Sequence, residues 1–176
     1  DALVAELSTR SEVDSILRKL GVRNVDGQEG CVHLQGAPVA EPLIVTEAGA
    51  KFLARPSTGQ KTGLFLDQRE NRIQLARVAQ DRTVTNLFGY TGGFSVHAAL
   101  AGARRVITVD QSAPALADAQ ENFRINGLSV DDHDFVAADI FDWSIPDKQD
   151  IVICDPPSLS RGQRSDGVAR KAYRDL

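Results

Sequence analysis

Cysteine, long apolar runs and clustered positive charge are scarce in this chain, and each shortage excludes a class of protein. Its two cysteines, Cys31 and Cys154, lie far apart, so neither a disulfide framework nor a cysteine-bound zinc site is expected. The three histidines share no spacing typical of a metal site. No apolar run approaches the length needed to cross a bilayer, which argues against a membrane partner. Residues 1–10 lack the basic and apolar regions of a secretory signal, so a cytoplasmic location is predicted.

Charge gives a mixed indication about nucleic acid. The formal net charge is −4 and the pI is about 5.4, whereas binding to phosphates is driven by clustered Lys and Arg. Residues 160–176 are nonetheless basic, with Arg161, Arg164, Arg170, Lys171 and Arg174 against two acidic residues. This tail is either a basic edge that meets nucleic acid or a solvated loop and helix.

The N-terminal part of the chain predicts a small α+β accessory unit over residues 1–62. Ser11 and Asp14 have capping-box spacing and precede apolar residues at helical intervals, so residues 11–21 are predicted to form a short amphipathic helix. Segments 31–36, 41–47 and 50–56 read as short antiparallel strands separated by Gly, Pro and Glu. A charged helix follows over residues 66–81, with Leu66, Ile73, Ala76 and Val78 as its predicted inward positions.

From there to the end, strands alternate with helices, which predicts an α/β fold with a parallel sheet over residues 63–176. Strands are expected over 83–88, 105–110, 133–140 and 150–157, and helices over 93–103 and 112–128, the second with Ser112 as its N-cap and Gly127 past its end. Four strands make a short sheet, and residue 176 falls within a predicted helix. We expect either a natural protein that continues further or an unusually short sheet, whose open edge would favour a homodimer.

The turn after the first of these strands holds Gly89, Gly92 and Gly93. Glycines at such a turn let backbone N–H groups and a helix N-terminus approach a ligand closely. Asp110 ends the next predicted strand, where a carboxylate can accept hydrogen bonds from a ribose diol. The alternative is a tight turn without a ligand, in which Asp110 caps the following helix.

Two further strand ends carry candidate site residues. Asp139 ends the third strand and could accept a hydrogen bond from the amine of a base, although an Asp after a strand is often only an N-cap. Asp155, Pro156 and Pro157 end the fourth, where the prolines fix the backbone and leave carbonyls facing a planar substrate; the alternative is a merely stiff loop. Cys154 is predicted to be a buried, unreactive thiol, and Phe141 and Trp143 are predicted to be core residues rather than base-stacking ones.

Four segments in the same order resemble the class I S-adenosylmethionine-dependent methyltransferases that modify large-subunit ribosomal RNA. They read GQKTGLFLDQRENR, NLFGYTGGFSVHAALAGA, VDQSAPALADAQENFRINGL and DIVICDPPSLS, and the similarity covers most of residues 46–176. The resemblance implies a Rossmann-like sheet, incomplete at its C-terminal end, and S-adenosyl-L-methionine as the cofactor. The implied cofactor-binding residues are Phe88, Gly89, Tyr90, Thr91, Gly92, Asp110, Gln111, Asp139, Ile140, Gln68 and Arg72.

The same resemblance implies that Asp155, Pro156 and Pro157 hold the target base of a ribosomal RNA substrate. The nearest branches act on cytosine C5, with a PUA domain, or on guanine N7. No PUA domain is visible, and the family's nucleophilic cysteine lies in a C-terminal part outside these residues, so the two chemistries are not separated. A methyltransferase for a small molecule or a protein and a non-catalytic cofactor- or RNA-binding module remain alternatives.

Overall fold

The computed structural model describes residues 2–20, 30–59, 63–157 and 174. The chain forms two compact units: Asp1–Val45 with Leu53–Phe65, and Thr46–Phe52 with Leu66–Leu176. Residues 46–52, the tip of a hairpin, therefore group with the C-terminal unit although they precede residue 62. The domain boundary between residues 62 and 63 stays a prediction.

The first unit contains helix α1 (Ala2–Ser8) and the antiparallel strands β1 (Ser15–Lys19) and β2 (Cys31–Gly36). The helix predicted over residues 11–21 is wrong, because β1 occupies the middle of that segment. Pairing with β2 satisfies the backbone of β1, and Ile16 is buried at 9% exposure. Tertiary pairing thus overrides the short-range helical pattern, since an isolated helix of about three turns is only marginally stable in water.

Strands β3 (Leu43–Glu47) and β4 (Ala50–Ala54) form a two-stranded hairpin. Its two tip residues both have positive φ, 47° at Ala48 and 87° at Gly49, the combination that a tight hairpin with right-handed strand twist requires. Strands are thus confirmed within the predicted segments 31–36, 41–47 and 50–56, but β2 pairs with β1 and not with β3 or β4.

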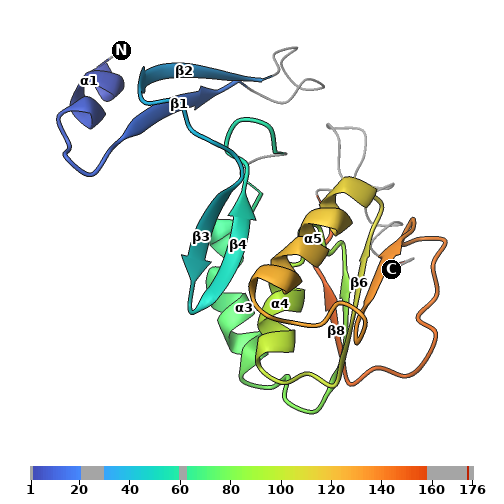
Figure 1. The fold of residues 1–176 in the computed structure, drawn as a ribbon. Coiled ribbons are helices and arrows are strands. Elements are labelled where there is room, and N and C mark those ends of the chain that lie inside the picture. Colours follow the sequence, from blue (N-terminus) through green and yellow to red (C-terminus); the bar gives the residue numbers. More distant parts are fainter. Residues whose placement is uncertain (1, 21–29, 60–62, 158–173, 175–176) are drawn as a thin grey trace. The chain divides into compact units, whose positions relative to one another are not determined.

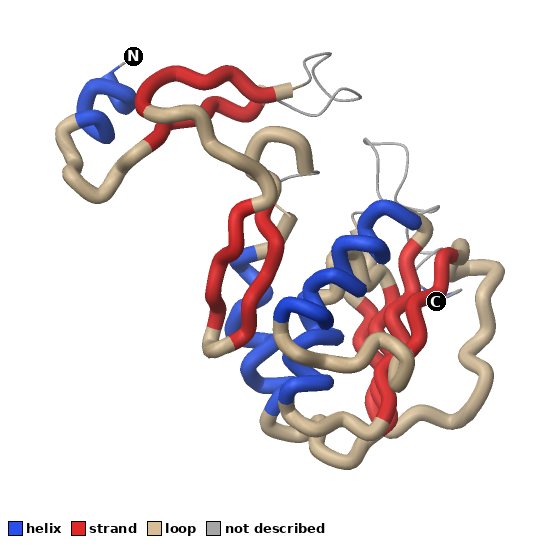
Figure 2. Tube along the Cα trace, in the orientation of Figure 1, coloured by secondary structure: helices blue, strands red, loops and turns tan. Residues whose placement is uncertain are grey.

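The second unit is built on a four-stranded sheet in the order β7-β6-β5-β8, and all of its pairings are parallel. The strands are β5 (Thr83–Leu87), β6 (Arg105–Asp110), β7 (Asp134–Ala137) and β8 (Ile151–Cys154). Helices α4 (Gly93–Leu100) and α5 (Ala113–Ile125) pack on this sheet, and α3 (Arg69–Ala76) packs on α4 (Figures 1 and 2). The predicted α/β class and parallel sheet are confirmed, as is Ser112 as the N-cap of α5.

Each face of the sheet has its own packing. On the face toward α4, Asn86 and Thr108 both bond to Ser95 of that helix, at 2.9 and 2.8 Å. The other face carries an apolar cluster of Leu87, Ile107, Val109 and Ile140, with Phe88, Val136, Ala138 and Trp143 packed against it. Trp143 is therefore a packing residue, as predicted, whereas Phe141 is 44% exposed.

The charged helix differs from its prediction in extent and in its inward face. It consists of a 3-10 turn η1 (Leu66–Gln68) followed by α3, which ends at Ala76. Leu66 and Val78, predicted to face inward, are 71% and 60% exposed; Leu66 lies in the 3-10 turn and Val78 after the end of α3. Arg72 and Leu75 are buried instead. Within the described parts of the chain, no helix has the length and apolar character to cross a membrane.

Candidate active site

The predicted site residues lie at one edge of the parallel sheet. Because all four strands run in the same direction, their carboxyl ends meet at the same edge. Strand order then sets the sequence of groups along this edge: Asp139 after β7, Asp110 at the end of β6, the glycine-containing turn after β5 and Asp155 after β8. Neighbouring groups are separated by about one strand spacing, roughly 5 Å.

The turn between β5 and α4 has an unusual backbone. Phe88 and Tyr90, which are not glycines, have φ of 55° and 47°, and Gly92 has φ of 76°. A non-glycine residue with positive φ costs about 1–3 kcal/mol of conformational free energy, and such strained residues are concentrated at functional sites. Hydrogen bonds hold the turn, from Gly89 N to Val109 O at 2.9 Å and from Gly92 N to Gly89 O at 2.8 Å.

Gly89 is needed because the turn lies directly on the sheet. A Cβ at this position would lie 2.5 Å from Cγ2 of Thr108 and 3.1 Å from Nδ2 of Asn86. Both neighbours are held in place by Ser95. The absence of a side chain therefore brings the backbone of the turn down onto the strand ends.

Asp110 connects two loops at the strand ends. Its Oδ2 accepts a hydrogen bond from Tyr90 N and its Oδ1 accepts one from Ser112 N, both at 2.8 Å. A carboxylate has about four acceptor positions, so both oxygens keep capacity for further donors such as a ribose diol. Burial, followed by the charges of Asp118 and Asp110, raises the pKa of Tyr90, so its phenol stays protonated. Gln111, next to Asp110, is exposed.

Asp139 and Ile140 have different environments. Asp139 is exposed, and its Oδ1 accepts a hydrogen bond from Phe141 N at 3.0 Å. Ile140 is only 7% exposed and belongs to the apolar cluster with Leu87 and Val109. This part of the edge therefore has a hydrogen-bond acceptor, Asp139, next to an apolar surface at Ile140.

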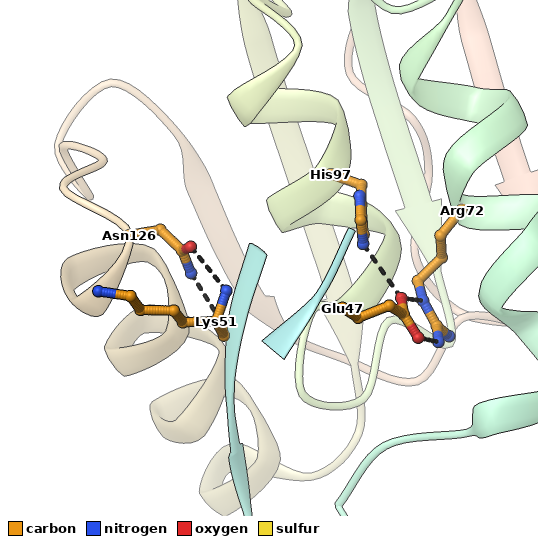
Figure 3. A network of polar contacts seen from close by, with 5 residues as sticks. All are labelled: Glu47, Lys51, Arg72, His97 and Asn126. Carbon is orange, nitrogen blue, oxygen red and sulfur yellow. Dashed lines mark hydrogen bonds and ion pairs between the residues drawn. The ribbon is translucent and has the colours of Figure 1, made fainter. Parts of the chain in front are cut away.

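Arg72 lies in a buried polar network that the sequence did not reveal (Figure 3). Its Nε and Nη2 donate to Glu47 at 2.7 and 2.6 Å, and Nε2 of His97 lies 3.1 Å from the same carboxylate. Burial would raise the pKa of Glu47, but the hydrogen bonds and charges of Arg72 and His97 outweigh it and lower that pKa. Burial lowers the pKa of His97 despite the opposing effect of Glu47.

This network joins the hairpin tip to helices α3 and α4 within the second unit. Gln68, the other predicted contact on this segment, is half-buried and accepts a hydrogen bond from Asn71 at 2.6 Å. No spacing in the sequence connects Glu47, Arg72 and His97, which come from a strand and two helices. Only the tertiary packing brings them together.

The end of β8 leaves its predicted residues accessible. Asp155 and Pro157 are exposed and Pro156 is half-buried. Cys154 is also exposed, so its predicted burial is wrong: it shares the outward alternation of Val152, which is 47% exposed. Partial burial and then the charge of Asp155 raise the pKa of the Cys154 thiol, which disfavours the reactive thiolate. Of the basic tail, only Arg174 lies within the described residues, and it is exposed.

In the part of the chain that the structure describes, no group of three or more His, Cys, Asp or Glu side chains is arranged to hold a metal ion. The polar groups at the strand ends instead suit an organic ligand with a diol, an amine and an anionic or zwitterionic end. A parallel α/β sheet with a glycine-containing turn and an acidic residue on the adjacent strand defines a nucleotide- or nucleoside-binding enzyme of the Rossmann-like class.

Comparison with known proteins specifies this class. Residues 14–176 match the family described as S-adenosylmethionine-dependent methyltransferase, and the chain belongs to that family. It is 40% identical over 148 residues to a ribosomal RNA large subunit methyltransferase of Deinococcus radiodurans, with 81% of this chain and 36% of the relative covered. It is 33% identical over 172 residues to ribosomal RNA large subunit methyltransferase I of Aeromonas salmonicida, with 95% and 42% covered.

The fold agrees with the family. The crystal structure of the methyltransferase SMU.776, complexed with SAH, superposes with a TM-score of 0.79 at 30% identity, covering 98% of this chain and 46% of that one. The chain thus spans less than half the length of these relatives. S-adenosylmethionine is the family's cofactor. Three features of this edge are compatible with it: the close backbone approach at Gly89, the acceptor oxygens of Asp110 and the apolar surface at Ile140.

Proposed function

We propose that the full-length protein transfers the methyl group of S-adenosylmethionine to a base of large-subunit ribosomal RNA. The observation that carries the proposal is the order of groups along the carboxyl edge of the sheet. The cofactor residues follow β7, β6 and β5, and the Asp155-Pro156-Pro157 segment follows β8 on the other side of β5. The names of the similar relatives supply the class of substrate.

In the proposed arrangement, the adenine lies at Asp139 and Ile140, and the ribose diol donates to Asp110 beside Gln111. The methionine part lies over residues 88–92, where the N–H groups of the first turn of α4 are not paired within the helix. Gln68 is proposed to contact this part directly. Arg72 is proposed to act through its buried pair with Glu47, which holds α3 next to α4.

S-adenosylmethionine supplies an electrophilic methyl group on a sulfonium. We propose that Asp155 and the carbonyls fixed by Pro156 and Pro157 hold the acceptor base beside it, by accepting hydrogen bonds from the amino group of the base. Methylation of a ring nitrogen such as guanine N7 requires only this alignment. Methylation of cytosine C5 also requires a cysteine thiolate to add to C6, and the raised pKa of Cys154 makes it poorly suited to that role.

The test is methyl transfer from labelled S-adenosylmethionine to unmodified large-subunit RNA by the full-length protein, with the product identified by nuclease digestion and mass spectrometry. A labelled 7-methylguanine or 5-methylcytosine supports the proposal and decides the chemistry. Cofactor binding without transfer to RNA overturns the RNA substrate, and transfer to a small molecule or protein replaces it.

Two variants separate binding from catalysis in the same assay. Asp110→Asn should weaken binding of S-adenosylhomocysteine, measured by calorimetry, because it replaces one acceptor oxygen with a donor. Asp155→Ala should leave that binding within about twofold and reduce transfer to RNA. Equal transfer by Asp155→Ala and the unaltered protein would remove Asp155 from the site.

A further inference from the structure

Helix α5 contacts the turn that contains Gly89 through residues that are not among the proposed cofactor contacts. Nδ2 of Asn122 donates to the backbone carbonyl of Thr91 at 2.8 Å. Asn122 is fully buried at 0% exposure, and Thr91 is 4% exposed. A buried carbonyl without a donor is unfavourable, so this bond helps to determine the orientation of the peptide after Thr91.

A second contact from the same helix constrains the same turn. Ala119 lies one turn before Asn122, and a Cβ at Gly92 would lie 3.0 Å from the Cβ of Ala119. Gly92 has φ of 76° and is the N-cap of α4. The face of α5 formed by Ala119 and Asn122 therefore matches the turn in shape as well as in hydrogen bonding.

These contacts act on a backbone that is already strained. Phe88 and Tyr90, which follow β5, have positive φ. Tyr90 N donates a hydrogen bond to Oδ2 of Asp110. Surrounding structure must maintain such conformations. Asn122 bonds to the carbonyl of the next residue, Thr91. The turn is therefore held by one hydrogen bond at Tyr90 N and by another just after Tyr90.

Asn126, four residues later on the same side of the helix, provides a matched comparison. Its amide makes two bonds to the backbone of Lys51, accepting from N at 2.8 Å and donating to O at 2.7 Å (Figure 3). Nδ2 of Asn126 also donates to Asn122 O at 2.6 Å. Asn122 therefore bonds to the backbone of the turn after β5, and Asn126 bonds to the hairpin tip within the same unit.

We propose that Asn122 is a positioning residue for the cofactor: it holds the Thr91 carbonyl so that residues 88–92 keep the conformation that binds the methionine end of S-adenosylmethionine. The inference rests on the proposed function of this turn. It assigns no chemical step to Asn122, whose side chain acts only through the backbone of the turn.

The test compares Asn122→Leu, Asn122→Ala and Asn126→Ala in the full-length protein. Leu keeps the branched skeleton of Asn but is bulkier and has no donor, whereas Ala removes the donor without overpacking the site. Both Asn122 variants should bind S-adenosylhomocysteine about tenfold more weakly, the effect of losing one buried hydrogen bond. The KM for S-adenosylmethionine should rise more than kcat falls. Asn126→Ala should lower the urea midpoint and leave the affinity within about twofold.

A purely structural role for Asn122 would lower the urea midpoint while leaving affinity unchanged at a temperature where the variant is folded, and that result overturns the inference. Failure of the unaltered protein to bind S-adenosylhomocysteine would instead refute the proposed function. If the Asn122 variants do not fold, a measurement on the unaltered protein still tests the proposal. The side-chain amide NMR signals of Asn122 should shift on titration with S-adenosylhomocysteine more than those of Asn126, and equal shifts would contradict the proposal.

Discussion

At the scale of single residues, the glycine at position 89 is explained by its close neighbours, Thr108 above all. A Cβ at this position would lie closest to the Cγ2 methyl of Thr108, whose hydroxyl bonds to Ser95. The requirement for glycine here comes from close approach, since Gly89 is not among the residues with positive φ. Phe88 and Tyr90 beside it do have positive φ and nevertheless carry large side chains.

Gly89→Ala should therefore destabilise the protein by about 1–3 kcal/mol, the usual penalty for overpacking. The second substitution Thr108→Ser removes the methyl group and keeps the hydroxyl, so the double variant should recover most of that loss. Urea unfolding of the four proteins measures the coupling. Additive effects of the two substitutions would show that the penalty has another origin.

Glu41 in the first unit offers a prediction about pH. Its Oε1 accepts from N and Oγ of Ser57, both at 2.5 Å, and its Oε2 accepts from N and Oγ1 of Thr58 at 3.2 and 2.7 Å. Burial would raise the pKa of Glu41, but the hydrogen bonds from Ser57 and Thr58 lower it to about 2. The folded-state pKa is thus below the unfolded value of about 4.3.

A depressed carboxyl pKa adds stability above the unfolded pKa, and this contribution is lost as the pH falls through the folded pKa. The unaltered protein should be more stable than Glu41→Gln at pH 6, and the difference should shrink steadily between about pH 4.5 and pH 2. Urea titrations of both proteins across this range measure it. A difference that does not depend on pH would contradict the predicted role of the charge.

At the scale of elements, the tip of the β3–β4 hairpin is held by buried charge. Glu47 and Arg72 have side chains only 6% and 2% exposed, so removing either leaves the other charged and without its main partner. Breaking a buried pair in this way costs about 3–5 kcal/mol, although the pair itself contributes less than that.

Glu47→Gln should lower the free energy of unfolding by roughly this amount, about 3–5 kcal/mol. The exposed pair of Arg124 and Glu121, with side chains 51% and 46% exposed, is a matched control, and Glu121→Gln should cost less than about 1 kcal/mol. A double-mutant cycle with Arg72→Met isolates the interaction between the buried partners. Equal costs for the two carboxylate substitutions would show that burial does not strengthen the network.

At the scale of the whole molecule, cofactor binding should be visible as stability. A ligand that binds only the folded protein adds RT ln(1 + [L]/Kd), or about 2.7 kcal/mol at one hundred times Kd. S-adenosylhomocysteine should therefore raise the urea midpoint of the full-length protein in a concentration-dependent way. Adenosine, which lacks the homocysteine part, should raise the midpoint less at the same concentration.

The strands and helices of the second unit followed from local signals. Apolar segments such as residues 83–88 ended at glycines, Ser112 capped α5, and strands alternating with helices left a parallel sheet as the simplest arrangement. Residues 11–21 show why the rest could not be predicted. Their helical spacing was genuine but short, and the strand β1 depends on pairing with β2 further along the chain.

The sequence by itself determined the fold class and the groups at the strand ends, because strand direction and chemical type are local properties. It did not determine that Arg72 would face inward, that Cys154 would be exposed or that Asn122 would hold the Thr91 carbonyl. Those outcomes depend on partners distant in sequence: Glu47 for Arg72, the outward face of β8 for Cys154, and the turn after β5 for Asn122. A buried polar group is favourable only with its partner, so only the tertiary structure could decide its place.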